Sequence, residues 1–281
     1  MSVLHAIILG IVQGATEFLP ISSTGHLRLI PRLFGWSDAG ITFDVALHFG
    51  TLLAVISYFW RDWIDVLRPV VNTALRKPHA ASPRFGRNLF WGIVIGCVPA
   101  GIFGLLLNDT IDRIEQTKSL DTQVMLVVAS MLIVVGIIMY ACDKYGSKKK
   151  KKLAQMCFMD WVAIGFAQAA ALVPGVSRSG ATISAGLARG MDRDSAARFS
   201  FLLSTPIILA AALTHAKDIM HGGIPHNEVT AFIAGVVSSA VVGYITIRFL
   251  LGYLRKHSVN VFVWYRLALG VFILLFVAVK M

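Results

Sequence analysis

The first group of residues that could carry out chemistry lies near the N-terminus, in the segment QGATEFLPISSTGH. Gln13 and Glu17 are four residues apart, so they share one face if the segment is helical. Glu17 could act as a base, bind a metal, or be a structural carboxylate that backbone N–H groups satisfy. After Pro20 the segment supplies candidate nucleophiles, bases and phosphate contacts: Ser22, Ser23, Thr24 and His26.

The second group lies in the segment GVSRSG, residues 175–180. Arg178 stands between Ser177 and Ser179, and the planar fork of an arginine matches two phosphate oxygens at once. Gly175 and Gly180 allow a tight backbone whose N–H groups can also face a phosphate. A guanidinium in an apolar setting needs an anion, and the two available are Glu17 and a substrate phosphate.

Other polar residues inside apolar stretches are weaker candidates. Asp44 and His48 are four residues apart and could either line the same site or cap and hydrate a helix end. Arg266 is a lone charge that we expect to pair with a backbone carbonyl or a partner acid. The sequence contains no Walker A motif, no GxGxxG and no Cys/His metal spacing, and its three cysteines fit small apolar packing positions.

The composition sets the class of protein that must position these residues. Of the 281 residues 56% are hydrophobic and only 15% are charged, with a mean hydropathy of +0.71, whereas soluble domains carry about 25% charged residues. Six segments have the length and apolar character of membrane-spanning helices: 43–60, 89–107, 124–140, 196–213, 229–251 and 261–279. The net charge of +11 comes largely from loops between these spans and is not read as a nucleic-acid surface. We expect an all-α integral membrane protein.

The two chemical segments follow apolar stretches that are too short to cross. Residues 4–19 would reach about 24 Å as a helix and residues 161–173 about 20 Å, against a hydrocarbon core of about 30 Å. Each stretch stops at a proline, Pro20 or Pro174. We predict two re-entrant hairpins, a form of backbone tolerated where protein or a water-filled cavity surrounds it.

The two halves of the chain resemble each other. GIVQGATEFLPISSTG aligns with GFAQAAALVPGVSRSG, which pairs Gln13 with Gln168 and Ser23 with Ser177. We predict a single membrane domain, 1–281, with repeat one at about 1–142, a basic linker at about 143–155, and repeat two at about 156–281. Because each half has three crossings, the repeats are inverted and the hairpin tips meet near the midplane.

The basic residues indicate the orientation. If the end of the first span at Trp60 is cytoplasmic, the cytoplasmic side holds 18 Lys and Arg residues and the other side 6. Cytoplasmic loops of membrane proteins carry such an excess. The run of five lysines, 148–152, is then an orientation signal and a contact for anionic lipid. We therefore predict that both termini and the mouth of the first hairpin face outward.

Over its whole length the sequence resembles the undecaprenyl-diphosphate phosphatase family, which is associated with bacitracin resistance. The resemblance rests on QGATE, FLPISSTGH and PGVSRSG. It implies hydrolysis of undecaprenyl diphosphate to the monophosphate at the outer face of the bacterial inner membrane, which recycles the lipid carrier for peptidoglycan synthesis. It also implies a divalent cation, Mg²⁺ or Ca²⁺, held mostly by substrate phosphates, and often a homodimer.

The resemblance also implies roles for individual residues. Glu17 would bind metal or assist proton transfer, Ser23 would be the favoured nucleophile, His26 a base or rival nucleophile, and Arg178 the clamp on the diphosphate. Many family members have a second glutamate where this chain has Gln13, whose carboxamide is no base. The remaining substrate contacts would be Gln13, Ser22, Thr24, Ser177, Ser179, Gly175 and Gly180.

Two other functions are compatible with parts of the sequence. A secondary transporter or lipid flippase would account for the inverted repeat, but a carrier needs no cluster of Ser, His and Glu. An intramembrane serine protease would use the serine and histidine but not the arginine at the opposing tip. At this point the nucleophile could be Ser23, His26 or a water molecule.

Overall fold

The computed structural model is helical throughout the described part of the chain, which covers residues 1–36, 40–76, 86–116, 121–146, 150–222 and 227–280. The side chains of 86–87, 108–116, 121, 215–222 and 280 are outside the description. The α-helices are α1 Val3–Phe18, α2 Ser23–Phe34, α3 Ile41–Tyr58, α4 Trp60–Ala74, α5 Gly86–Gln116, α6 Asp121–Ala141, α7 Phe158–Ala170, α8 Arg178–Ala188, α9 Arg193–Gly222, α10 Val229–Leu254 and α11 Asn260–Lys280.

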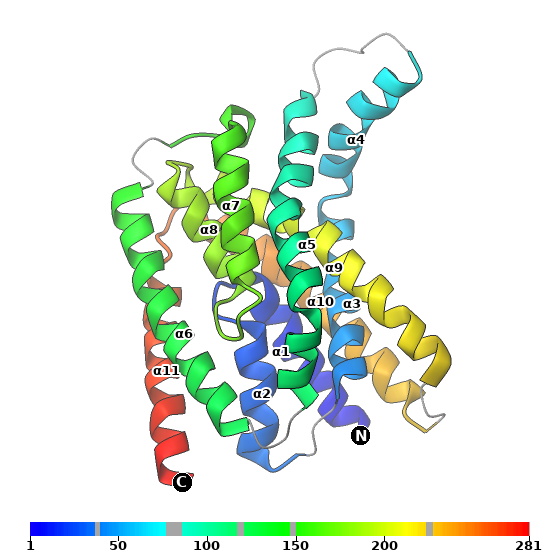
Figure 1. Ribbon diagram of the computed structural model, residues 1–281, viewed down its shortest axis with the longest axis vertical. Coiled ribbons are helices and arrows are strands. Elements are labelled where there is room, and N and C mark those ends of the chain that lie inside the picture. The colour runs from blue at the N-terminus through cyan, green and yellow to red at the C-terminus, as the bar shows by residue number, and fades with distance from the viewer. Residues whose placement is uncertain (37–39, 77–85, 117–120, 147–149, 223–226, 281) are drawn as a thin grey trace.

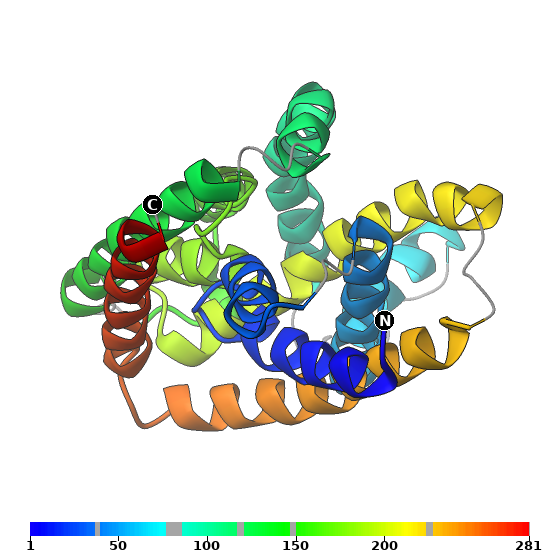
Figure 2. The ribbon, with the colours of Figure 1, turned by 90° about the horizontal axis from the view of Figure 1, so that it is seen from below.

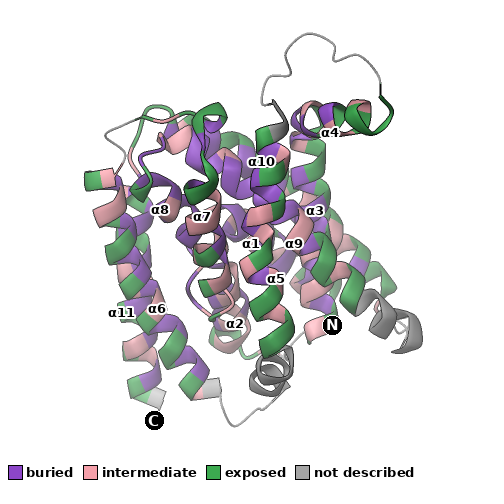
Figure 3. Ribbon diagram, turned by 45° about the horizontal axis from the view of Figure 1, so that its top comes forward, coloured by how far each residue is buried: buried purple, intermediate pink, exposed green. Residues whose placement is uncertain are grey.

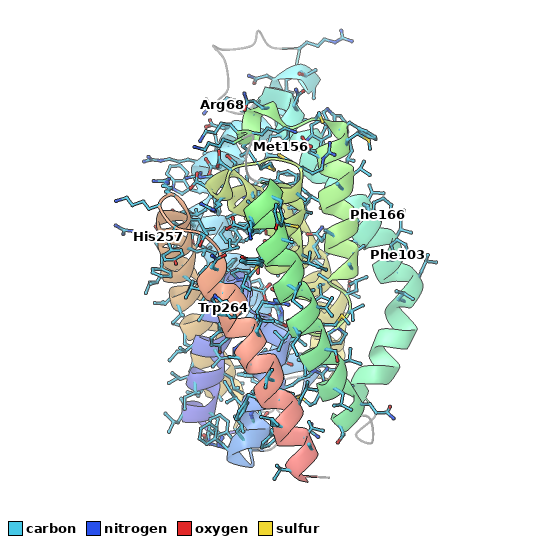
Figure 4. The ribbon with its side chains drawn as sticks, turned by 90° about the vertical axis from the view of Figure 1, so that its left-hand side faces the viewer. Arg68, Phe103, Met156, Phe166, His257 and Trp264 are labelled. Carbon is cyan, nitrogen blue, oxygen red and sulfur yellow. The ribbon has the colours of Figure 1, made fainter. Side chains whose placement is uncertain are left out.

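The six predicted spans are confirmed as helices, α3, α5, α6, α9, α10 and α11, each long and apolar enough to cross a membrane. Apolar side chains on their outer surfaces stay exposed, as expected where lipid replaces protein. Phe103, Phe166 and Trp264 point outward from the flank of the bundle (Figure 4). The protein is therefore a multi-pass membrane protein.

The two shorter predicted stretches form α1 and α7. α1 ends directly before Pro20 as expected, whereas α7 ends at Ala170, four residues before Pro174. Leu19, the residue before Pro20, is extended, with φ −65° and ψ 138°, because a following proline disfavours the helical region. The prediction of 161–173 for the second stretch was shifted by three residues, since α7 spans Phe158–Ala170. Residues Ala171–Pro174 form turns that carry the chain into α8.

The start of α7 is fixed by the buried carboxylate of Asp160. Asp160 accepts hydrogen bonds from the Cys157 backbone N–H, Lys151 Nζ and Arg189 Nε, at 2.9, 2.8 and 2.9 Å. Burial by itself raises the pKa of Asp160, but these donors outweigh it and hold the pKa below its ordinary value. Asp160 thus joins the linker, α7 and the end of α8 at one point.

One helix was missed, because residues 61–88 were treated as a loop. α4 contains Arg61, Asp62, Asp65 and Arg68, too many charges for a span, and a search for uncharged runs passes over it. Its apolar residues nevertheless recur at helical spacing, which is the signature of an amphipathic helix.

The arrangement places α1 and α2 in the lower half of the molecule and α7 and α8 in the upper half, with both chain ends at the bottom (Figure 1). Seen from below, α2 lies near the centre and the longer helices surround it (Figure 2). The buried residues concentrate on α1, α8, α9 and α10 in the middle of the molecule (Figure 3).

Close backbone packing fixes the position of α1. A Cβ at Gly14 would lie 2.6 Å from the Ser239 carbonyl oxygen and 2.8 Å from the Gly243 nitrogen, so only glycine allows α1 to approach α10 this closely. Glu17 lies less than one turn beyond Gly14. This contact therefore fixes the depth at which the Glu17 carboxylate sits.

Candidate active site

The first turn is built around a strained serine. Ser22 has φ 74° and ψ 97°, a backbone region that residues other than glycine rarely adopt. Its conformation reverses the chain immediately before α2, so that Ser23 and Thr24 become the first two residues of that helix. The N-terminal turn of a helix presents unpaired N–H groups and favours anions.

The second turn repeats this conformation. Ser177 has φ 69° and ψ 114°, and its hydroxyl accepts the Gly180 N–H at 3.2 Å as the N-cap of α8. Because Ser22 and Ser177 occupy the same place before their helices, the predicted pairing of Ser23 with Ser177 was wrong by one residue. The structural counterpart of Ser23 is Arg178, the first residue of α8.

The two turns meet at the Glu17 carboxylate. Oε1 accepts a hydrogen bond from Arg178 Nη2 at 2.9 Å, which links α1 to the first residue of α8. Oε2 accepts hydrogen bonds from the Ser23 hydroxyl at 2.8 Å and from Gln13 Nε2 at 3.1 Å. Glu17 is buried, and a buried carboxylate is stable only when donors and a counter-charge compensate it. The predicted shared face of Gln13 and Glu17 is confirmed.

Arg178 uses only half of its fork on Glu17. Nη1 is buried and has no hydrogen-bond partner among the described residues. Unpaired buried donors are costly, of order 1–3 kcal/mol each. The Arg178 residue also lines the cavity described next, so its positive charge lies beside the space that an anionic ligand would occupy.

A cavity of about 230 Å³ lies between the two turns. Its polar wall carries candidate residues of both turns, of α1 and of α3: Glu17, Ser22, Ser23, Thr24, His48, Gly175, Ser177 and Arg178. Its apolar wall comes from the turn that follows α7 and from α9: Ala171, Val173, Ile207, Ile208 and Ala211. Pockets that enclose a whole small ligand have roughly 300–1,000 Å³, so this cavity suits a headgroup and leaves a long tail outside it.

His48 joins the site and Asp44 does not reach the lining of the cavity. His48 Nδ1 lies 2.8 Å from the Asp44 carbonyl oxygen and must donate to it, since a carbonyl only accepts. His48 Nε2 lies 3.6 Å from Glu17 Oε2 and faces the cavity. Of the two predicted lining residues, the structure brings only His48 to the cavity wall.

His26 does not line the cavity. Its Nδ1 donates to the Ser22 carbonyl oxygen at 2.7 Å, and its Nε2 lies 2.7 Å from the Tyr265 hydroxyl. Both ring nitrogens are therefore engaged, and the ring is buried against α11. This geometry does not support the predicted role of His26 as base or rival nucleophile. It fits a residue that holds the strained Ser22 in place.

The remaining predicted residues shape the two turns. The Ser179 hydroxyl donates to the Leu19 carbonyl oxygen at 3.1 Å, which ties the second hairpin to the first. Gly175 has φ 92°, and a Cβ there would lie 2.6 Å from the Val128 backbone. A Cβ at Gly180 would lie 3.1 Å from Arg266 Nη1. Of these three residues Gly175 lines the cavity, whereas Ser179 and Gly180 lie outside the lining.

Arg266 has a larger role than sequence reasoning gave it. The side chain is fully buried on α11, and it pairs with backbone carbonyls, as expected. It donates to Pro20 at 3.1 Å in the first turn and to Gly175 and Val176 at 3.1 Å each in the second, as well as to Met131 and Leu132 of α6. One guanidinium therefore clamps both turns. Its only sequence signal was a lone arginine in a span.

The predicted metal role of Glu17 depends on whether other ligands for a metal surround it. Within the described residues, no three His, Cys, Asp or Glu side chains gather as metal ligands. Both Glu17 oxygens are already occupied by Arg178, Ser23 and Gln13. These residues do not form a resident metal site, since a divalent cation prefers several oxygen ligands of its own.

Known proteins resemble this chain over its full length. The family described as "Bacitracin resistance protein BacA" matches residues 6–272. A protein of Pelotomaculum thermopropionicum named undecaprenyl-diphosphatase is 46% identical over 100% of this chain and 98% of its own length. Proteins of the same name from Thermomicrobium roseum and Moorella thermoacetica are 41% and 45% identical, over 99% and 97% of both chains respectively. The chain belongs to the bacitracin resistance protein BacA family.

Proposed function

We propose that this protein is a membrane phosphatase that hydrolyses undecaprenyl diphosphate to undecaprenyl phosphate and inorganic phosphate. The observation that carries the proposal is that Arg178 lines a cavity that also holds the hydrogen-bonded pair of Ser23 and Glu17. A guanidinium is suited to a phosphate. A hydroxyl bonded to a carboxylate has the arrangement of a nucleophile and its base.

In the first step the Ser23 hydroxyl attacks the terminal phosphorus of the diphosphate. Its proton passes to Glu17 Oε2, which already accepts the hydrogen bond from that hydroxyl at 2.8 Å. The bond between the terminal phosphorus and the bridging oxygen breaks, and prenyl monophosphate leaves. Arg178 and the N-terminal turns of α2 and α8 stabilise the negative charge on the phosphates.

In the second step a water molecule attacks the phosphoserine. Glu17, which holds the proton from the first step, returns it to the Ser23 oxygen as the phosphorus–oxygen bond breaks. The phosphorus takes the hydroxyl of the water, and the second proton of the water is released to the solvent. The products are inorganic phosphate and free Ser23. Because Glu17 serves first as base and then as acid, a single carboxylate suffices for both steps.

The cavity also suggests how the lipid is placed. The polar wall is suited to the two phosphates, and the apolar residues Ile207, Ile208 and Ala211 of α9 continue away from it. The prenyl tail then runs along α9 into the bilayer. A space of about 230 Å³ matches a headgroup only, so the tail stays in lipid.

The finer architecture belongs to the proposal. Contacts between helices of one half recur between the corresponding helices of the other, which supports an inverted repeat of 1–142 and 156–281. α1 packs on α10 as α7 packs on α5, and α3 packs on α10 as α9 packs on α5. The corresponding helices α3 and α9 also pack on each other, as do α6 and α11. The short helices α1–α2 and α7–α8 are the proposed re-entrant hairpins.

We place the protein in the bacterial inner membrane with the α4 end of the bundle in the cytoplasm. The excess of basic residues at that end supports this orientation, which opens the first hairpin to the outer face, where the lipid carrier is recycled for peptidoglycan synthesis. A divalent cation, Mg²⁺ or Ca²⁺, would accompany the substrate phosphates and is not needed in any step above. A homodimer remains a prediction from the family resemblance.

The test is phosphate release from undecaprenyl diphosphate by purified protein in detergent, with and without a chelator. The proposal expects release that is lost in Ser23→Ala. Protein that binds the lipid but releases no phosphate would favour a carrier instead, although a carrier has no use for a serine bonded to a buried carboxylate.

A further inference from the structure

Helix α4 has one face that is packed against the bundle. Val66 and Pro69 are buried, and the Asp62 carboxylate accepts a hydrogen bond from Arg198 Nη1 at 3.2 Å. Only Phe59 separates α3 from α4, and Arg198 also lies over the Phe59 ring, 5.9 Å from its centroid. The position of α4 relative to the end of α3 is therefore fixed by specific contacts.

A second face of α4 is apolar and exposed. Trp60, Ile64, Leu67, Val71 and Leu75 have exposed fractions of 52%, 41%, 44%, 50% and 58%. Their spacing of four, three, four and four residues places them in one stripe along the helix. No other described part of the chain covers this stripe. Five neighbouring large apolar side chains in water would be an exposed patch of the kind that marks an interaction site.

A polar edge runs parallel to the apolar stripe, one residue further along the chain. Arg61, Asp65, Arg68, Asn72 and Arg76 follow with the same spacing, and the three arginines are exposed. Arg68 lies at the upper end of the molecule, together with Met156 (Figure 4). Further basic side chains at that end, Arg189, Arg193 and Arg198, are already paired with aspartates.

We propose that α4 lies in the interface of an anionic bilayer leaflet, with the apolar stripe among the acyl chains and the arginines on lipid phosphates. Three observations favour lipid as the occupant. The helix starts at the end of a membrane-spanning helix, so the stripe begins at the depth of the headgroups. Trp60, the first residue of the stripe, is of a type enriched at that depth. The edge is basic, as in interfacial helices that bind anionic lipid.

The proposal has a consequence for the site. Through Arg198, α4 is coupled to α9, and α9 carries the apolar wall of the cavity. An interfacial α4 therefore anchors the helix along which the prenyl tail is proposed to run. The interfacial position itself does not depend on the phosphatase function.

The test uses single cysteines in a background without Cys97, Cys142 and Cys157, reconstituted in vesicles of phosphatidylcholine and phosphatidylglycerol. Nitroxide labels at Ile64→Cys and Leu67→Cys should collide severalfold more often with oxygen than with a water-soluble nickel complex. The matched control on the polar edge, Asp65→Cys, should show the reverse preference. Phosphate release and monodispersity identify variants that misfold.

A second measurement shows whether α4 prefers anionic phosphatidylglycerol to phosphatidylcholine. A bimane label at Leu67→Cys should be quenched more strongly by brominated phosphatidylglycerol than by brominated phosphatidylcholine at equal mole fraction. The double variant Arg61→Gln, Arg68→Gln should remove this preference. Each lost charge should lower the preference for phosphatidylglycerol over phosphatidylcholine about fivefold at low salt. The proposal is overturned if stripe labels are as open to nickel as Asp65→Cys. It is also overturned if they are shielded from both reagents in a concentration-dependent way, which would show that a second copy covers the stripe.

Discussion

The Ser23 hydroxyl and the Glu17 carboxylate are joined by a hydrogen bond of 2.8 Å, although Pro20 and a strained Ser22 lie between them. The oxygen of Glu17 that accepts from Ser23 is not the one that Arg178 binds. One carboxylate can therefore receive a proton on one side while its charge is balanced on the other. This separation of tasks is the basis of the reaction proposed here.

Ser23→Ala and Glu17→Gln should each lower the rate of phosphate release by roughly 100-fold or more, the effect expected for a positioned catalytic group. The measurement is initial phosphate release from undecaprenyl diphosphate, normalised to monodisperse protein. Ser57→Ala on α3, whose hydroxyl bonds only its own helix at Ala54, is the matched control and should be unchanged. Near-normal turnover in folded Glu17→Gln would remove Glu17 from proton transfer.

Tyr265→Phe separates the two roles that His26 could have. If His26 only holds the Ser22 carbonyl, losing the bond from Tyr265 to His26 Nε2 should lower activity less than about tenfold and leave the pH profile unchanged, since no titrating group of the reaction is altered. The full pH–rate profile of Tyr265→Phe is the measurement. A displaced limb of that profile would instead place His26 in proton transfer.

Arg266→Met should mainly reduce the amount of folded protein. The substitution keeps much of the volume of the side chain but leaves five carbonyls of α6 and both turns without their donor. A buried carbonyl that loses its donor costs roughly 1–3 kcal/mol. Thermal unfolding in detergent measures this loss. A variant with unchanged unfolding temperature and full activity would show that the clamp on the two turns is dispensable.

Ala211→Phe should discriminate between substrates by tail length. Ala211 lies in the apolar wall of the cavity on α9, so a bulky ring there obstructs the path proposed for the tail and leaves the polar wall intact. The ratio of kcat/KM for undecaprenyl diphosphate to that for farnesyl diphosphate should fall by at least about tenfold, since a steric clash is worth 1–3 kcal/mol. An equal loss with both substrates would place the tail elsewhere.

Much of the fold could be predicted because bilayer thickness converts directly into lengths of uncharged sequence, as for α6 and α11. The two turns could be predicted because Pro20 and Pro174 interrupt the apolar stretches and are followed by hydroxyl-bearing residues. Glu17 was one of the two anions expected for Arg178, and the structure shows that the two side chains pair. These features depend on local sequence or on a simple repeat.

Other features depend on contacts that no local pattern encodes. The direction of the His26 ring is set by Tyr265, 239 residues away, and the bonds of Arg266 are set by the carbonyls of two turns. The correspondence of Ser23 with Arg178 was missed because the offset between the halves changes by one residue between Pro20 and Ser22. α4 was missed because its charged residues exclude it from the uncharged runs that indicate membrane spans, although its apolar residues recur at helical spacing.

The most direct test of the central claim compares Arg178→Lys with Arg178→Ala. Arg178 binds Glu17 through Nη2 and lines the cavity, where we propose that its fork binds phosphate, and a lysine ammonium lacks this planar fork. The measurement is initial phosphate release at several concentrations of undecaprenyl diphosphate, normalised to monodisperse protein. The account predicts that lysine restores folded protein but leaves turnover roughly 100-fold or more below wild type, nearly as low as alanine, as for loss of one donor to a transition-state anion. Near wild-type turnover in the lysine variant would contradict it, because Arg178 would then serve only as the counter-charge of Glu17.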